Sequence, residues 1–170
     1  MTARLRLILP LLCLLAGLPG PSRSQPLAPP AGPVVLEIGG RIGRTTDGKL
    51  ARFDREALQR LPRTVIETST PWTTGRQRFA GVSLKDLMEA VGAQGSEVSA
   101  VAINDYRVSI PLQEAIRDGA LLAFEANGEP LPVRSRGPLW IVFAYDQSPR
   151  LRGEQILSRS IWQLKLLEVR

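Results

Sequence analysis

The sequence predicts a single α+β domain with short helices. Three observations indicate this class. Strand-like segments outnumber helix-like ones, the longest amphipathic helix pattern covers only residues 84–91, and strands and helices do not alternate regularly. A doubly wound parallel sheet requires such alternation, so that class is disfavoured. The sequence shows no internal repeat and no heptad pattern.

The first 24 residues have the layout of a secretory signal peptide. Arg4 and Arg6 form a positive n-region, and the apolar run 7–18 is shorter than the roughly 20 residues that a spanning helix needs. Ser22 and Ser24 are small residues just before the expected cleavage site. An uncleaved membrane anchor is the alternative interpretation. The pattern predicts export to a bacterial periplasm, or secretion, with no transmembrane segment after cleavage.

Cleavage would change what chemistry the chain can perform. The only cysteine, Cys13, would leave with the peptide, and the sequence contains no histidine. The mature chain would therefore lack thiolate and imidazole chemistry and could form no disulfide. It would lose three arginines and no acid, which lowers the net charge from +6 to +3. Export argues against a nucleic-acid partner, whereas small anions or an anionic surface remain open.

Residues 25–33 carry four prolines and predict a flexible or extended linker, so the domain is expected to span residues 34–170. Within it, Ser83 and Asp86 have capping-box spacing before an apolar face, and Gly92 closes that helix. Asn127-Gly128 predicts a hairpin. Short helices are also expected at 54–58 and 112–117, and strands at 34–38, 64–68, 98–103, 107–110, 120–125, 131–133, 139–145 and 161–169.

An ordered set of segments resembles the oxidoreductase molybdopterin-binding domain family, the fold of sulfite oxidase and periplasmic methionine-sulfoxide reductase. The set comprises FAGVSLKDL, AINDY, SIP, LA, NGEPL and RGPLWIV, at residues 79–87, 102–106, 109–111, 122–123, 127–131 and 136–142. The resemblance covers most of residues 64–169. It implies a single mixed-sheet α+β domain with short helices.

The resemblance also implies a molybdenum ligand that this chain lacks. Members of the family bind molybdenum through the pterin dithiolene and one protein cysteine, which matches a position near Ser69 here. A serine hydroxyl is a poorer ligand because its proton must be lost first. We therefore expect a relative without cofactor or metal. A molybdopterin enzyme with a serine near the metal is the alternative.

The segment 68–78 is the first candidate site, which we interpret as a loop. Ser69 and Trp72 would line a polar pocket there, with Arg76 or Arg78 facing an anion. The structural alternative is a surface loop with solvated arginines, in which Trp72 covers the edge of the core.

Two further sets are candidates. Asn104 and Tyr106 belong to a predicted tight turn that borders the active-site mouth in the resembled family, although a turn needs no function. Arg134 and Arg136, followed by Gly137, would present guanidinium groups and a backbone amide to phosphate or carboxylate. A purely solubilising basic loop is the alternative there.

Direct signs of catalysis are weak. Glu67, Asp105 and Asp146 are far apart in sequence, and no phosphate loop, nucleophile elbow or metal-ligand spacing is present. The sequence favours a cofactor-free ligand-binding or protein-interaction module, with a small anionic ligand or a membrane-bound sensor or redox protein as partner. The alternatives are a molybdopterin-dependent oxidoreductase and an envelope protein that binds anionic polymer or lipid.

Overall fold

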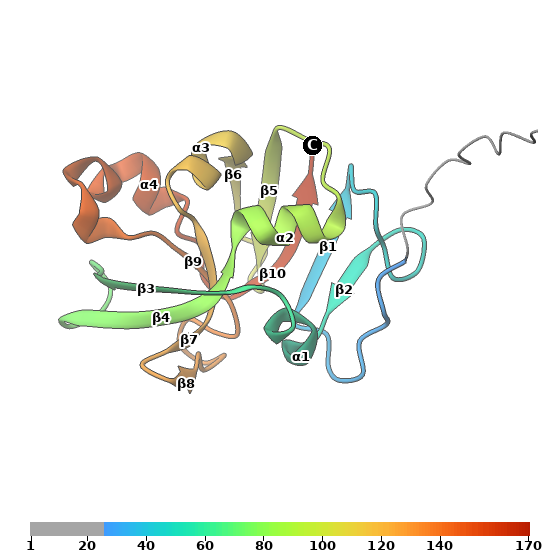
Figure 1. The fold of residues 1–170 in the computed structure, drawn as a ribbon. Helices are drawn as coiled ribbons and strands as arrows, with labels where there is room; N and C mark the ends of the chain where they lie inside the picture. The colour runs from blue at the N-terminus through green and yellow to red at the C-terminus, as the bar shows by residue number, and fades with distance from the viewer. Residues whose placement is uncertain (1–25) are drawn as a thin grey trace, which may run out of the picture.

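The computed structural model describes residues 26–170 (Figure 1). The predicted signal peptide, residues 1–24, lies outside the described residues. Within the described part of the chain, no helix has the length and apolar character needed to cross a membrane.

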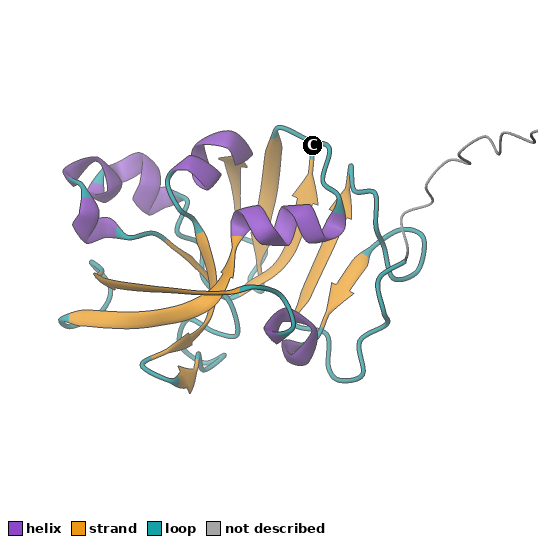
Figure 2. Ribbon diagram, viewed as in Figure 1, coloured by secondary structure: helices purple, strands orange, loops and turns teal. Residues whose placement is uncertain are grey.

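The domain is built on two β-sheets with short helices packed against them, which confirms the predicted α+β class (Figure 2). In the first sheet the strand order is β2-β1-β10-β5-β6, and β1 lies parallel to β10 while the other neighbours are antiparallel. This sheet is therefore mixed, as expected. Its strands are β1 (Leu36–Gly40), β2 (Ala51–Phe53), β5 (Glu97–Ala102), β6 (Arg107–Pro111) and β10 (Leu164–Val169).

The second sheet is antiparallel, with the order β3-β4-β7-β8 and a further strand, β9, paired with β7. Its first strand, β3, forms a terminal edge and joins β4 in a long hairpin (Figure 1). The strands are β3 (Arg63–Ser69), β4 (Arg76–Ser83), β7 (Leu121–Ala126), β8 (Glu129–Pro130) and β9 (Trp140–Val142).

The predicted helices form with the caps that the sequence indicates. Helix α1 (Arg55–Gln59) begins after Asp54, whose carboxylate accepts the Ala57 amide, and α3 covers Leu112–Arg117. Helix α2 (Leu84–Val91) has Ser83 as its N-cap and ends at Gly92, which adopts the left-handed conformation. Such a turn is easiest for glycine, so the stop signal has a clear physical basis.

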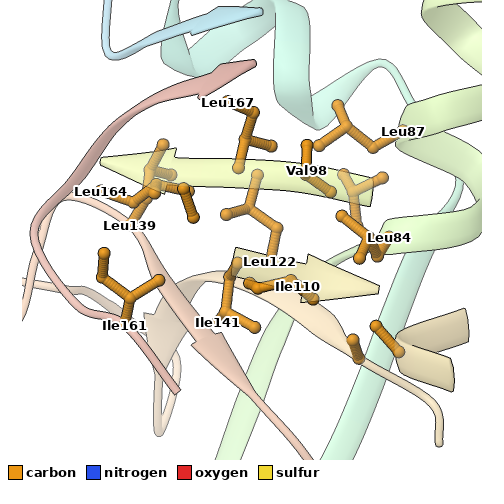
Figure 3. Packing of buried hydrophobic residues seen from close by; sticks show 14 of the residues in the cluster. Leu84, Leu87, Val98, Ile110, Leu122, Leu139, Ile141, Ile161, Leu164 and Leu167 are labelled. Carbon is orange, nitrogen blue, oxygen red and sulfur yellow. The ribbon is translucent and has the colours of Figure 1, made fainter. Parts of the chain in front are cut away.

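The main core joins both sheets to α2. Leu84 and Leu87 of α2 and Leu122 of β7 are buried together with Val98 and Leu167 of the first sheet (Figure 3). Because alternate residues of a strand point to opposite faces, one set of apolar side chains from each sheet can fill this space. A smaller cluster on the other side of the second sheet contains Phe79 and Trp140.

Four expectations about the elements need correction. Residues 68–78 are not one loop, because Arg76 and Arg78 already belong to strand β4. Residues 131–133 form no strand, since the return strand of the Asn127-Gly128 hairpin is β8. The strand expected at 139–145 covers only Trp140–Val142, and the one expected at 161–169 begins at Leu164.

The segment between β9 and β10 holds elements that the sequence did not predict. They are two 3₁₀ turns, η1 (Tyr145–Gln147) and η2 (Pro149–Arg152), and helix α4 (Glu154–Ser158). The described part of the proline-rich segment is also attached to the domain, because Asp54 accepts the amides of Ala31 and Gly32.

Candidate functional site

The β3–β4 hairpin carries three of the predicted site residues, Ser69, Trp72 and Arg76. Strands β3 and β4 pair in continuous register from Arg63 opposite Val82 to Ser69 opposite Arg76. The connecting turn is held by Thr70, whose hydroxyl accepts the amide of Trp72 at 3.1 Å. This local hydrogen bond directs the chain so that the Trp72 side chain packs back onto the domain.

All three tryptophans of the chain meet at this point. The Trp72 ring lies edge-to-face with Trp140 and Trp162, at centroid distances of 5.8 and 5.6 Å, and Tyr145 is 6.1 Å away. Such edge-to-face pairs are favourable beyond the area they bury. Trp140 is fully buried and donates its indole N–H to the Ser160 carbonyl at 3.2 Å, so it anchors the cluster.

A pocket of about 300 Å³ opens beside Trp72. It is bounded by the β5–β6 turn on one side and by the end of α4 and the chain that follows it on the other. The turn is held by Asn104, whose side-chain oxygen accepts the Tyr106 amide, and Asp105 has a positive φ of 65°. The lining is aromatic, aliphatic and neutral polar: Trp72, Ala102, Asn104, Tyr106, Leu157, Ser158, Ser160, Ile161 and Trp162.

Apolar side chains are exposed around the mouth of this pocket. Tyr106 is 53% exposed and Trp162 is 38% exposed, although both are large. Ile103 is also exposed, and its amide bonds the Gln163 carbonyl next to Trp162. Exposed aromatic residues that gather around a hollow are typical of binding sites.

Ser69, the position that matches the family cysteine, is engaged in a polar network outside the pocket lining. Its hydroxyl donates to Asp146 at 2.6 Å and accepts from Arg152 at 2.5 Å, while its amide donates to the second Asp146 oxygen at 2.7 Å. Arg152 also pairs directly with Asp146. Hydrogen bonds from Ser69, together with Arg152, lower the pKa of Asp146 to about 2. The Asp146 carboxylate therefore remains charged at neutral pH.

The predicted arginine pair does not converge on the pocket. The Arg136 guanidinium donates to the Trp72 carbonyl at 2.6 Å and lies 5.3 Å from the Trp140 ring centre, so it supports the aromatic cluster from behind. Arg134 is exposed, and the Gly137 amide already donates to the Pro132 carbonyl. Arg76, on β4, donates to the Glu67 carbonyl at 3.2 Å.

The three acids considered for catalysis are also separated. Asp105 pairs with Lys165 at 2.8 Å, Asp146 belongs to the Ser69 network, and Glu67 lies 3.9 Å from Arg78. Each therefore has a different cationic neighbour, and they form no carboxylate pair.

Of the seven predicted site residues, the pocket brings together Trp72, Asn104 and Tyr106, whereas Ser69, Arg76, Arg134 and Arg136 lie outside its lining. Sequence reasoning missed Ser158, Ser160 and Trp162 in the lining. It also missed the role of Asp146 and Arg152 beside Ser69. A tryptophan next to an alternating strand was the only signal for Trp162.

The model of the oxidoreductase molybdopterin binding domain family matches residues 51–145, more than half of the chain. The chain therefore belongs to this family, as the ordered segments indicated. Among solved structures it resembles the sulfane dehydrogenase SoxCD from Paracoccus pantotrophus, with a TM-score of 0.55 and 22% identity. That likeness covers 79% of this chain and 37% of the SoxCD chain, so this chain matches less than half of its length. No match was found among curated proteins.

The residues around Ser69 are a poor fit for the molybdenum centre that the family implies. Thiolate is the soft ligand suited to that metal, and residues 26–170 contain no cysteine. The Ser69 hydroxyl already donates its proton to the Asp146 carboxylate. A metal at Ser69 would have to displace both this carboxylate and Arg152. Among the described residues, no three His, Cys, Asp or Glu side chains are grouped to hold a metal ion.

Proposed function

We propose that this protein is an exported, periplasmic binding module of the molybdopterin-binding oxidoreductase family that works without the molybdenum cofactor. Export is supported by the charged n-region, the short apolar run and the small residues of the first 24 positions. Loss of the cofactor is supported by the chemistry of Ser69, whose hydroxyl is shared between a carboxylate and a guanidinium.

The observation that supports binding most strongly is the convergence of distant residues on one pocket. Trp72 follows β3, Tyr106 follows β5 and Trp162 precedes β10, yet all three line the same hollow of about 300 Å³. That volume lies at the lower end of the range for small-molecule sites. The ligand is therefore a compact molecule, or one side chain of a partner protein.

The lining also indicates the chemistry of the ligand. Flat aromatic walls suit a ring or another apolar group, and Asn104 and Ser158 offer neutral hydrogen-bonding groups. The Ser160 hydroxyl is already bonded to Tyr145 and Ile156. The lining contains no charged side chain, which favours a neutral ring-bearing ligand over the anion expected from the arginines. The same surface would accept an aromatic side chain from a membrane-bound sensor or redox partner.

Two measurements on the mature, periplasmically expressed protein test this proposal. The first is the molybdenum and pterin content after growth of the host with molybdate. We expect neither in stoichiometric amount. Stoichiometric molybdenum and pterin would contradict the cofactor-free assignment and favour an oxidoreductase.

The second measurement is isothermal titration calorimetry with indole as a neutral ring probe and sulfate as an anion probe. Indole should show saturable binding that is at least about tenfold weaker in Tyr106→Ala, because that variant removes one exposed wall. Val34→Ala, another exposed apolar position outside the pocket lining, is the matched control. A response to sulfate alone, or an indole response that Tyr106→Ala leaves unchanged, would contradict the proposed pocket chemistry.

A further inference from the structure

Strand β3 is the longest terminal strand of either sheet. It has seven residues, against five in β6, three in β2 and two in β8. Within the described part of the chain no further strand pairs with its outer edge. Proteins usually protect such an edge by shortening it, by bulges or by proline, because its free backbone groups can pair with another strand.

The backbone groups that face outward can be identified from their neighbours. The Arg78 amide donates to the Asn127 side-chain oxygen, and the Arg78 carbonyl accepts the Asn127 amide, so both groups point toward β7. Arg78 and the residue opposite it on β3, Glu67, therefore form a non-hydrogen-bonded pair. The Ser69 amide likewise points outward to Asp146. Because the pattern alternates along an antiparallel ladder, the amides and carbonyls of Arg63, Val65 and Glu67 face away from β4.

The side chains of these three residues are exposed on the same face of the strand. Their order along the strand is a cation, an apolar residue and an anion. When two copies of β3 pair antiparallel about a two-fold axis through Val65, Arg63 of each copy lies opposite Glu67 of the other. The two Val65 side chains then meet at the axis, where each is 38% exposed in the single chain.

We propose that β3 is a homodimerisation edge, in which two copies of this chain join their second sheets through antiparallel pairing of Arg63–Glu67. The arrangement forms three residue pairs, each able to exchange two backbone hydrogen bonds, and places opposite charges at both ends. Charged side chains on an edge strand usually discourage pairing, but in this two-fold register they attract each other. A C2 interface requires self-complementarity, which this edge has.

Both charged side chains already have an intrachain partner that pairing must share or replace, and for Glu67 this partner is Arg78 at 3.9 Å. Arg63 binds Glu125 at 2.6 Å, and Arg76 donates to the Glu67 carbonyl at 3.2 Å. The second contact is exposed, and the Arg63 amide of the second copy would replace it. The Ser69 end of β3 is already covered by Asp146, so pairing stops at Glu67. An edge of this length makes a small interface, with an expected Kd between about 10 µM and 1 mM.

Sedimentation velocity of the mature protein over this concentration range is the first test. We expect a concentration-dependent dimer. Val65→Lys should raise the dimer Kd at least about tenfold, because it places two ammonium groups at the axis. Val34→Lys, at an exposed valine away from β3, should leave the Kd unchanged. A monomer at about 1 mM, or a dimer that Val65→Lys leaves intact, overturns the proposal.

Charge exchange provides the second test. Arg63→Glu and Glu67→Arg should each weaken the homodimer, because each places like charges opposite one another at both ends. An equimolar mixture of the two variants should recover the dimer, since every end pair is then of opposite sign. Circular dichroism checks folding, because Arg63→Glu also loses the Glu125 contact. A mixture that dimerises no better than the separate variants overturns the pairing register.

Discussion

Replacing Tyr145 with phenylalanine removes a single oxygen behind the aromatic pocket. The Tyr145 hydroxyl is buried and donates to the Ser160 hydroxyl at 2.7 Å, and Ser160 in turn donates to the Ile156 carbonyl at 2.9 Å. In the variant the Ser160 hydroxyl still donates to the Ile156 carbonyl. Only the hydrogen bond that the Ser160 oxygen accepts from Tyr145 is lost. We expect Tyr145→Phe to lower the free energy of unfolding by about 1 kcal/mol at pH 8.

The same variant should become relatively more stable as the pH rises. Burial raises the pKa of the Tyr145 hydroxyl to about 12, whereas an unfolded tyrosine has a pKa of about 10. Between these values the unfolded chain releases a proton that the folded chain keeps, so the wild type loses stability with increasing pH. At pH 11 this loss amounts to about 1.4 kcal/mol, which offsets the hydroxyl's contribution.

Urea unfolding at pH 8, 10 and 11 measures the effect. The difference between wild type and Tyr145→Phe should shrink from about 1 kcal/mol at pH 8 to about zero near pH 11. Tyr106→Phe, which alters the exposed tyrosine of the pocket mouth, is the matched control and should keep the pH dependence of the wild type. A difference that stays constant from pH 8 to pH 11 would refute the assignment of a buried, neutral hydroxyl.

Two further predictions concern the junction between β4 and α2. Gly81→Ala should destabilise the domain by about 1–3 kcal/mol or prevent folding. The added Cβ would overlap the Leu122 carbonyl of the paired strand β7. Thermal unfolding and the soluble yield measure this effect. Ser83→Ala should lower the free energy of unfolding by about 1 kcal/mol, because it removes the acceptor of the Asp86 amide. An equal loss in Ser83→Thr, which keeps a capping oxygen, would contradict that explanation.

Local signals were the most reliable part of the sequence. Capping residues and glycine stops defined α2 and α3 to the residue, and Asp54 caps α1 as expected. These motifs act through hydrogen bonds and backbone conformations within a few residues, so they require no knowledge of the fold. The ordered segments also identified the family. The export signal and the loss of the cofactor stay predictions.

The predicted strand and loop boundaries were wrong where strand pairing and long-range contacts determine the structure. Arg76 and Arg78 lie in a polar stretch that is typical of a loop, but both pair with β3, opposite Ser69 and Glu67, and so extend β4. The strand expected at 139–145 is interrupted because η1 directs Asp146 toward Ser69. A polar network between residues 77 positions apart leaves no periodic pattern in the sequence.

Residue types by themselves showed that residues 26–170 offer no thiol and no imidazole, because they include neither cysteine nor histidine. They also indicated Trp72, Asn104 and Tyr106 as candidate ligand-binding residues. Only the tertiary structure showed that these three residues share one pocket with Trp162. It also showed that Arg136 supports the aromatic cluster, and that Ser69 binds Asp146 and Arg152 outside the pocket. The physical reason is that side-chain type is local, whereas a site depends on strand order and register, which bring distant segments together.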